Sequence, residues 1–176
     1  MRYIAAIAIV LFATCGTVYA KDDTKTPVGV AYQVFLPSNS TTKDVFGDSW
    51  NGFGLQVITP QEEDRWTPMV TLGMFQSSGD GDATLYALNV GLERGLSGSD
   101  KARPYVILKA GPYYGTVDVP SQGIDENKVG LNANATVGIL FNERFYLEAR
   151  YDYFSKLAGF NFNGFTLAVG VKLFDL

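Results

Sequence analysis

The chain has 176 residues, with 14 Lys or Arg, 18 Asp or Glu and no His, and its formal net charge is −4. This length fits one domain, and the acidic balance offers no basic field that would bind nucleic acid. A single Cys and the absence of His leave too few ligands for a transition-metal site, and the sequence contains no phosphate loop or nucleotide fingerprint. We therefore expect no metal, no cofactor and no nucleic-acid partner.

Residues 1–20 have the pattern of a secretory signal peptide. Arg2 supplies a positive start, residues 3–14 form an uncharged apolar run, and residues 18–20 suit a signal peptidase. We expect cleavage after Ala20, which leaves a mature chain of residues 21–176 without Cys. The apolar run is shorter than the roughly 20 residues that a membrane-spanning helix needs. Lipidation at Cys15 is an alternative, but the residues before it match such a signal poorly.

From residue 28 onward, apolar and polar residues alternate with a period of two, which is typical of β-strands. We predict one domain of eight strands, separated by segments rich in Gly, Pro, Asn and Asp. The predicted strands span residues 28–36, 49–59, 66–76, 83–94, 104–117, 128–141, 145–155 and 162–174. The first of them is nearly apolar on both faces, so its facing stays open. Most have about the 9–11 residues with which a tilted strand crosses an outer membrane.

The connection between the sixth and seventh strands is a test of register. A two-residue turn would set apolar positions opposite polar ones, because a slip of one residue inverts every facing. A three-residue connection over 142–144 pairs Phe141 with Phe145 and keeps the faces consistent. The same register sets three polar-face pairs side by side, namely Glu148 with Gly138, Arg150 with Thr136 and Asp152 with Asn134.

Two loops and one proline carry further predictions. Residues 37–48 should form a loop with one helical turn, because a capping-box pattern begins at Thr41 and Gly47 can close the turn. Residues 118–127 should form the longest loop of the second half. Pro112 falls inside the fifth strand and predicts a bulge or a strand end there, because proline cannot donate to the ladder.

Two kinds of eight-stranded barrel show this alternation of apolar and polar residues along their strands. A transmembrane barrel turns the apolar face to lipid, whereas a soluble lipocalin-like barrel encloses it. Here the polar face is rich in Gly, Ala, Asn and Thr with a few charges of both signs, which suits a narrow interior better than a water-exposed wall. Aromatic residues near strand ends fit interfacial girdles: Trp50, Trp66, Phe141, Phe145, Tyr153, Phe165 and Phe174. We predict an all-β, eight-stranded antiparallel up-and-down transmembrane β-barrel with short loops.

In this pattern, over residues 28–174, the chain resembles the small outer-membrane β-barrels of the OmpX and OmpA-transmembrane-domain type. The resemblance implies Sec export, the outer membrane of a Gram-negative-type bacterium and a monomeric state. It implies lipid, lipopolysaccharide and the barrel-assembly machinery as partners. The last strand of such proteins usually ends in an aromatic residue, whereas here Asp175 and Leu176 follow Phe174. Enzymatic barrels of the outer membrane use a His as general base, and because this chain has none we predict no enzymatic activity.

The candidate site is a set of charged residues on the polar face, which a transmembrane barrel would hold in its lumen: Glu93, Lys109, Glu148, Arg150, Asp152 and Lys172. Such a set could transfer protons or gate a pore, but a paired network that satisfies buried charge is the favoured interpretation. We therefore predict a structural or surface-interaction barrel whose polar interior is filled by side chains. A narrow channel for small or apolar solutes and a soluble periplasmic lipocalin-like binder of apolar ligands are the alternatives.

Overall fold

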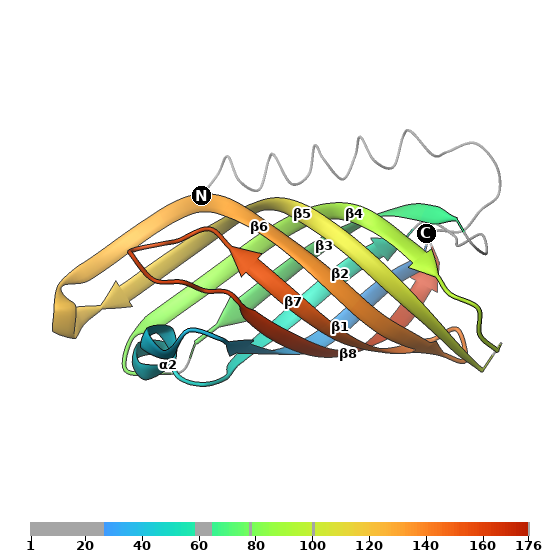
Figure 1. Cartoon of the computed structure of the whole chain (residues 1–176), viewed down its shortest axis with the longest axis horizontal. Coiled ribbons are helices and arrows are strands. Elements are labelled where there is room, and N and C mark those ends of the chain that lie inside the picture. Colours follow the sequence, from blue (N-terminus) through green and yellow to red (C-terminus); the bar gives the residue numbers. More distant parts are fainter. Residues whose placement is uncertain (1–26, 59–64, 78, 100, 176) are drawn as a thin grey trace.

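Eight antiparallel strands form a closed barrel in this computed structural model, as predicted, and each strand pairs with its neighbours in the chain (Figure 1). The structure describes residues 27–58, 65–77, 79–99 and 101–175, so the predicted signal peptide lies outside the described residues. Among those residues, no helix is long and apolar enough to cross a membrane. The strands are β1 Pro27–Pro37, β2 Trp50–Ile58, β3 Trp66–Gln76, β4 Asp82–Gly95, β5 Ala102–Val119, β6 Ile124–Phe141, β7 Phe145–Phe154 and β8 Gly164–Asp175.

The barrel turns its apolar side chains outward, as predicted. Along β7 exposure alternates residue by residue, so that Leu147 is 50% exposed while its neighbour Glu148 is 6% exposed. The other strands follow the same rule where they form the barrel wall, because side chains of a strand alternate between its two faces. The outward set includes Phe53, Leu55, Leu72, Tyr86, Val90, Leu92, Leu108, Val137, Ile139, Leu167, Val169 and Leu173. An apolar-ligand carrier would enclose these residues, so this orientation argues against the soluble-carrier alternative.

The burial of its side chains shows which face of β1 points into the lumen, a point that the sequence left open. Gln33 and Phe35 are buried in the lumen, whereas Tyr32 and Leu36 are exposed on the wall. β1 also closes the barrel, because it pairs with β8 from Pro27 opposite Asp175 to Pro37 opposite Gly164, with one register shift between Val28 and Gly29. The two ends of the described chain therefore meet in one seam.

The predicted register of β6 and β7 is confirmed. Phe141 lies opposite Phe145, and the three polar-face pairs that follow from this register are all present. In the connection, Asn142 and Glu143 adopt φ angles of 47° and 57°, and the Arg144 N–H donates to the Phe141 carbonyl at 3.0 Å. The tight connection holds the register that keeps Arg150 and Asp152 inside.

Three local predictions were wrong. Most of the segment 118–127 is not a loop, because β5 runs to Val119 and β6 begins at Ile124, with only the 3-10 turn Pro120–Gln122 between them. Pro112 neither ends β5 nor shifts it, since Ala87 opposite Tyr113 and Val90 opposite Ala110 keep one register on both sides. Helix α2 (Ser40–Phe46) is capped by the Asn39 side chain rather than by Thr41, although Gly47 ends it as predicted.

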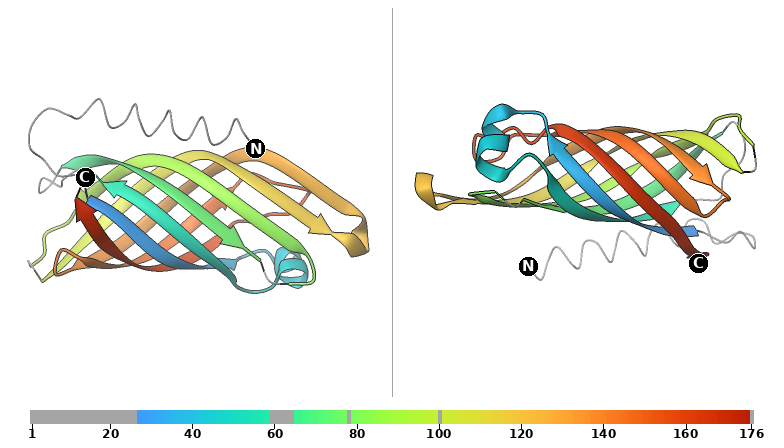
Figure 2. Two further views of the ribbon diagram at one scale, coloured as in Figure 1. Left: turned by 180° about the vertical axis from the view of Figure 1, so that it is seen from behind. Right: turned by 90° about the horizontal axis from the view of Figure 1, so that it is seen from below.

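The two ends of the barrel differ. Both chain ends of the barrel and the β4–β5 and β6–β7 connections lie at one end, which we call the terminal end. α2, the β3–β4 turn, the β5–β6 hairpin and the β7–β8 connection lie at the other, which we call the loop end (Figures 1 and 2). The β5–β6 hairpin projects beyond the rest of the loop end in these views.

Inward glycines make room for large side chains on neighbouring strands. Gly138 lies opposite Tyr105 and Gly170 opposite Tyr146. A Cβ atom added to Gly170 would stand only 2.1 Å from Cζ of Tyr146, and one added to Gly138 only 2.3 Å from Cζ of Tyr105. Each tyrosine therefore lies across the backbone of its glycine partner, which lets a narrow barrel hold bulky residues.

Candidate functional site

The lumen is the candidate site, and its side chains form three layers. The terminal-end layer contains Tyr105, Tyr146, Leu140, Met69, Ile107, Ala31 and Ala168. A polar layer lies in the middle, and an apolar plug fills the loop end. The terminal-end and polar layers follow from the inward positions of strands whose outward positions are apolar, whereas the plug also takes side chains from the connections.

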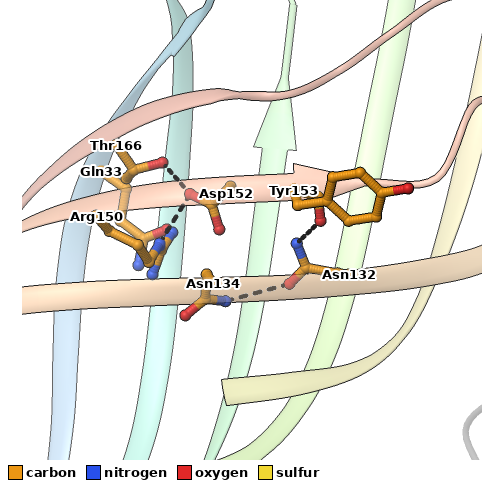
Figure 3. Close-up of polar contacts among 7 residues, drawn as sticks. All are labelled: Gln33, Asn132, Asn134, Arg150, Asp152, Tyr153 and Thr166. Atoms are coloured by element: carbon orange, nitrogen blue, oxygen red, sulfur yellow. Dashed lines mark hydrogen bonds and ion pairs between the residues drawn. The ribbon is translucent and has the colours of Figure 1, made fainter. Parts of the chain in front are cut away.

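The centre of the polar layer is an ion pair between Arg150 and Asp152 on β7 (Figure 3). Nε of Arg150 donates to Oδ2 of Asp152 at 2.9 Å, and both side chains are buried. The hydroxyl of Thr166 donates to the same carboxylate oxygen at 2.7 Å, and Nη2 of Arg150 donates to Oε1 of Gln33 at 3.2 Å. Three strands, β1, β7 and β8, thus share one hydrogen-bonded cluster, as buried charges require.

Arg150 also joins the polar layer to the plug. Its guanidinium carbon lies 5.7 Å from the centre of the Phe75 ring, within the distance of a cation–π contact. On the neighbouring strand β6, Nδ2 of Asn132 donates to the Tyr153 carbonyl at 2.9 Å, and Nδ2 of Asn134 donates to Oδ1 of Asn132 at 3.3 Å (Figure 3). The arginine therefore has polar partners on one side and an aromatic face on the other.

The six charged residues singled out from the sequence lie at different levels of the lumen. Arg150 and Asp152 pair with each other, whereas Glu148 accepts a hydrogen bond from the Tyr105 hydroxyl at 2.9 Å. The other three divide between the levels of the lumen. Lys109 is buried in the polar layer and lines a cavity there. Glu93 and Lys172 line a smaller cavity beside Tyr105 and Tyr146.

Sequence reasoning missed several residues that complete this layer. Gln33 went unnoticed because the facing of β1 was open. Thr166 and Asn132 were assigned to the polar face but not to the site, because neither carries a charge. The signal that could have found them is the inward register, which sets Thr166 opposite Arg150 across the β7–β8 ladder.

The plug at the loop end was not predicted. Phe35, Phe46, Trp50 and Phe162 are fully buried in it, and ring centres lie 5.4 Å apart for Phe35 and Trp50 and 5.5 Å apart for Trp50 and Phe162. The other buried members are Phe75, Ala83, Leu85, Ala87, Tyr113, Val117, Val119, Phe154, Leu157 and Phe160. The interfacial role predicted for Trp50 is therefore wrong, because its side chain points into the plug. Trp66, Phe145, Tyr153 and Phe165 are exposed on the wall as predicted, Phe141 is only half-buried, and the side chain of Phe174 lies outside the described set.

Hydrogen bonds from the connections hold the plug in place. The Thr42 hydroxyl of α2 donates to the Asn161 carbonyl of the β7–β8 connection at 2.8 Å. The Gly81 N–H of the β3–β4 turn donates to the Val45 carbonyl at 2.9 Å. Three connections are thus tied together over the aromatic cluster, and α2 serves as part of its cap.

Little space remains between the layers. The cavity beside Lys109 and Arg150 has room for about 20 Å³, and the one beside Glu93 and Lys172 for about 10 Å³. A single water molecule needs roughly 10–15 Å³ by this measure. Within the described residues, no group of three or more His, Cys, Asp or Glu is placed to hold a metal ion. Each of these two cavities thus has room for about one water molecule.

Solved structures share the fold at low sequence identity. Ail, the attachment invasion locus protein of Yersinia pestis, superposes with a TM-score of 0.59 and 20% identity over 88% of this chain and 100% of its own. It has also been crystallised with the heparin analogue sucrose octasulfate. Neisserial surface protein A superposes with a TM-score of 0.60 and 16% identity, over 84% of this chain and 97% of its own.

An enzyme is also among the similar structures. The outer membrane enzyme PagL superposes with a TM-score of 0.51 and 15% identity over 82% of this chain and 98% of its own. No family model matches the sequence, and no curated protein matches it. The chain therefore has the fold of small eight-stranded outer-membrane β-barrels, and this fold carries attachment, surface and enzymatic proteins alike.

Proposed function

We propose that the protein is an outer-membrane barrel that acts at its loop end, as a structural or surface-interaction protein, and that its lumen does not conduct. The observation that carries this proposal is the closure of the lumen at three levels. An aromatic plug, an ion-paired polar layer and a tyrosine-rich layer fill the same narrow interior. Eight strands leave an interior that side chains can just fill.

The wall supports a place in the membrane. Its outward residues form an apolar surface over all eight strands, which would be a very large exposed patch in water. Outer-membrane barrels carry short turns on the periplasmic side and longer loops outside. We therefore orient the terminal end toward the periplasm and the loop end toward the exterior. Sec export with cleavage after Ala20 belongs to this proposal, and N-terminal sequencing of the mature protein, expected to begin at Lys21, tests it.

The charge of the loop end limits its partners. Three lysines, Lys43, Lys128 and Lys156, stand there against seven acidic residues, Asp44, Asp48, Asp80, Asp82, Asp118, Asp125 and Glu126. A polyanion such as the heparin analogue bound by Ail would meet net repulsion at this end. Contact with lipopolysaccharide would accordingly depend on packing of the lipid's acyl chains against the apolar wall. The barrel-assembly machinery would be a partner during insertion.

We propose no catalytic role. Of the lumen carboxylates, Asp152 is held by Arg150 and Thr166 and Glu148 by Tyr105, and the space beside them admits no substrate. The absence of His removes the usual general base from the whole sequence. The fold of PagL therefore does not carry over its activity.

Fractionation and planar-bilayer recording test the proposal together. We expect a heat-modifiable protein in the outer-membrane fraction that gives no conductance steps in a bilayer in which a known porin gives clear steps. Recovery as a soluble periplasmic protein would contradict the membrane assignment. Regular steps from the folded protein would contradict a closed lumen and favour the narrow-channel alternative.

A further inference from the structure

The β5–β6 hairpin leaves one strand edge open beyond the barrel rim. β5 and β6 pair as far as Val119 opposite Ile124, whereas β6 and β7 pair only as far as Asn132 opposite Phe154. Residues 124–131 of β6 therefore have a strand partner on the β5 side and none on the β7 side. Figures 1 and 2 show this hairpin projecting past the other connections of the loop end.

The backbone groups on the open side can be identified from the last contact with β7. The Ser155 N–H donates to the Leu131 carbonyl at 2.9 Å, and the Leu131 N–H donates to Oγ of Ser155 at 2.9 Å. Both polar groups of Leu131 thus point to the β7 side. Because this direction repeats every second residue in an antiparallel strand, the N–H and C=O groups of Val129, Asn127 and Asp125 point to the open side as well.

This edge carries few of the features with which proteins protect open strands. Between residues 124 and 131 there is no Pro and the pairing with β5 shows no bulge, although both features commonly block edge pairing. Three charged residues lie on the edge: Asp125 is on one face of the hairpin, and Glu126 and Lys128, which are of opposite sign and two residues apart, share the other face. Glu126 and Lys128 are both exposed.

The spacing of these charges makes the edge complementary to itself. An antiparallel pair with a two-fold axis at Asn127 sets Glu126 of each copy opposite Lys128 of the other. It also sets Asp125 opposite Val129, so the N–H and C=O groups of residues 125, 127 and 129 in both copies can form a six-bond ladder. The charged pairs fall at the non-hydrogen-bonded positions, where opposed Cα atoms are only about 4.5 Å apart.

We propose that residues 124–130 of two copies of this chain pair edge to edge in an antiparallel β-ladder between two apposed membranes. This inference rests on the proposed function, because it needs the loop end outside the cell. Strands of such barrels tilt by about 35–45° from the barrel axis. A two-fold axis along the membrane normal keeps the course of β6 along that normal, from the loop end toward the terminal end, and so cannot make two copies antiparallel. An axis in the membrane plane reverses that course, which places the copies in facing membranes.

A charge-swap experiment in vesicles tests the pairing. Phosphatidylcholine vesicles carrying the folded barrel are labelled with donor or acceptor dyes, and their association is followed by energy transfer and turbidity. Wild-type vesicles should associate. Glu126→Lys and Lys128→Glu should each reduce association with their own kind by about tenfold or more, because each converts both cross-strand pairs to like charges.

Two combinations of variants, each expected to restore vesicle association, distinguish strand pairing from a general charge effect. Vesicles with Glu126→Lys should associate with vesicles with Lys128→Glu, and the double variant should associate with itself, because both combinations restore opposite charges across the axis. Asp44→Lys and Lys156→Glu change the loop-end charge equally but lie off the edge, so they should leave association near the wild-type level. A synthetic peptide of residues 124–131 should bind the open edge and so reduce the association of wild-type vesicles.

The outcomes separate this inference from the proposed function. Heat modifiability and bilayer silence are measured on the same preparations, and their failure would count against the proposed function. Wild-type vesicles that stay dispersed while the barrel is inserted and silent would overturn only the self-pairing. If both single variants lose vesicle association and their mixture does not recover it, the self-pairing is also overturned. An equal loss of association in the two off-edge controls would overturn it too.

Discussion

The plug and the polar layer fill the same lumen by opposite means. The plug is built from aromatic rings contributed by strands and by connections, including Phe46 of α2 and Phe162 of the β7–β8 connection. The polar layer is built from strand residues, and in its central ion pair Arg150 and Asp152 are each other's oppositely charged partner. The plug is therefore stabilised by many interchangeable apolar contacts, whereas the polar layer is stabilised by a few specific polar ones.

The sharpest test of this difference is Arg150→Met. The substitution leaves Asp152 buried with only the Thr166 hydroxyl as a described partner, and breaking a buried pair in this way costs about 3–5 kcal/mol. We expect a loss of about 4 kcal/mol in the free energy of unfolding, measured by urea titration in lipid vesicles. The double variant with Asp152→Leu should recover most of the loss. A double variant no more stable than the single one would show that the charge pair is not the cause.

A slightly smaller effect is expected in the plug from Phe162→Ala. The ring is fully buried and lies within 5.5 Å of Trp50 and 5.6 Å of Phe46, measured between ring centres. Its removal should cost about 3 kcal/mol and shift the fluorescence of Trp50 to longer wavelength. Adding Phe35→Ala should deepen the loss, unlike the second substitution in the polar layer. Phe165→Ala on the lipid-facing wall is the matched control and should cost less.

The smallest effect concerns the tie between α2 and the β7–β8 connection. Thr42→Val removes the hydroxyl that donates to the Asn161 carbonyl and keeps the side-chain volume, so we expect a loss of about 1 kcal/mol. The loss should be local, visible as faster hydrogen exchange in α2 with little change in global unfolding. Thr41→Val, on the exposed side of the same helix, should leave exchange unchanged. Equal changes in the two variants would contradict a specific tie.

The same contrast explains how much could be predicted from the sequence. The polar layer follows from alternation, because a period of two assigns Glu148, Arg150 and Asp152 to one face, and the apolar content of the other face decides which one meets lipid. The register of β6 and β7 followed from the pairing of Phe141 with Phe145. These predictions depend only on local geometry that every strand shares.

The plug escaped prediction because it depends on where the connections fold. Trp50 stands at the end of a strand, and a tryptophan there fits an interfacial girdle as well as a buried cluster. Only the position of α2, which is fixed by Asn39 and by the bond to Asn161, decides between them. The extension of β5 and β6 was missed for a similar reason. Val119 is buried in the plug, but most of residues 120–127 are exposed whichever way they face, so the segment lacks the alternation that marks a strand in lipid.

The seam between β1 and β8 has a consequence for biogenesis. Its strands are the first and the last of the barrel, so hydrocarbon cannot accept a partly assembled sheet without exposing two rows of unpaired peptide groups. Both strands must therefore be exported before the barrel can settle in the bilayer. A chain that lost either terminal strand would have no stable resting place there and would remain a substrate for chaperones and proteases.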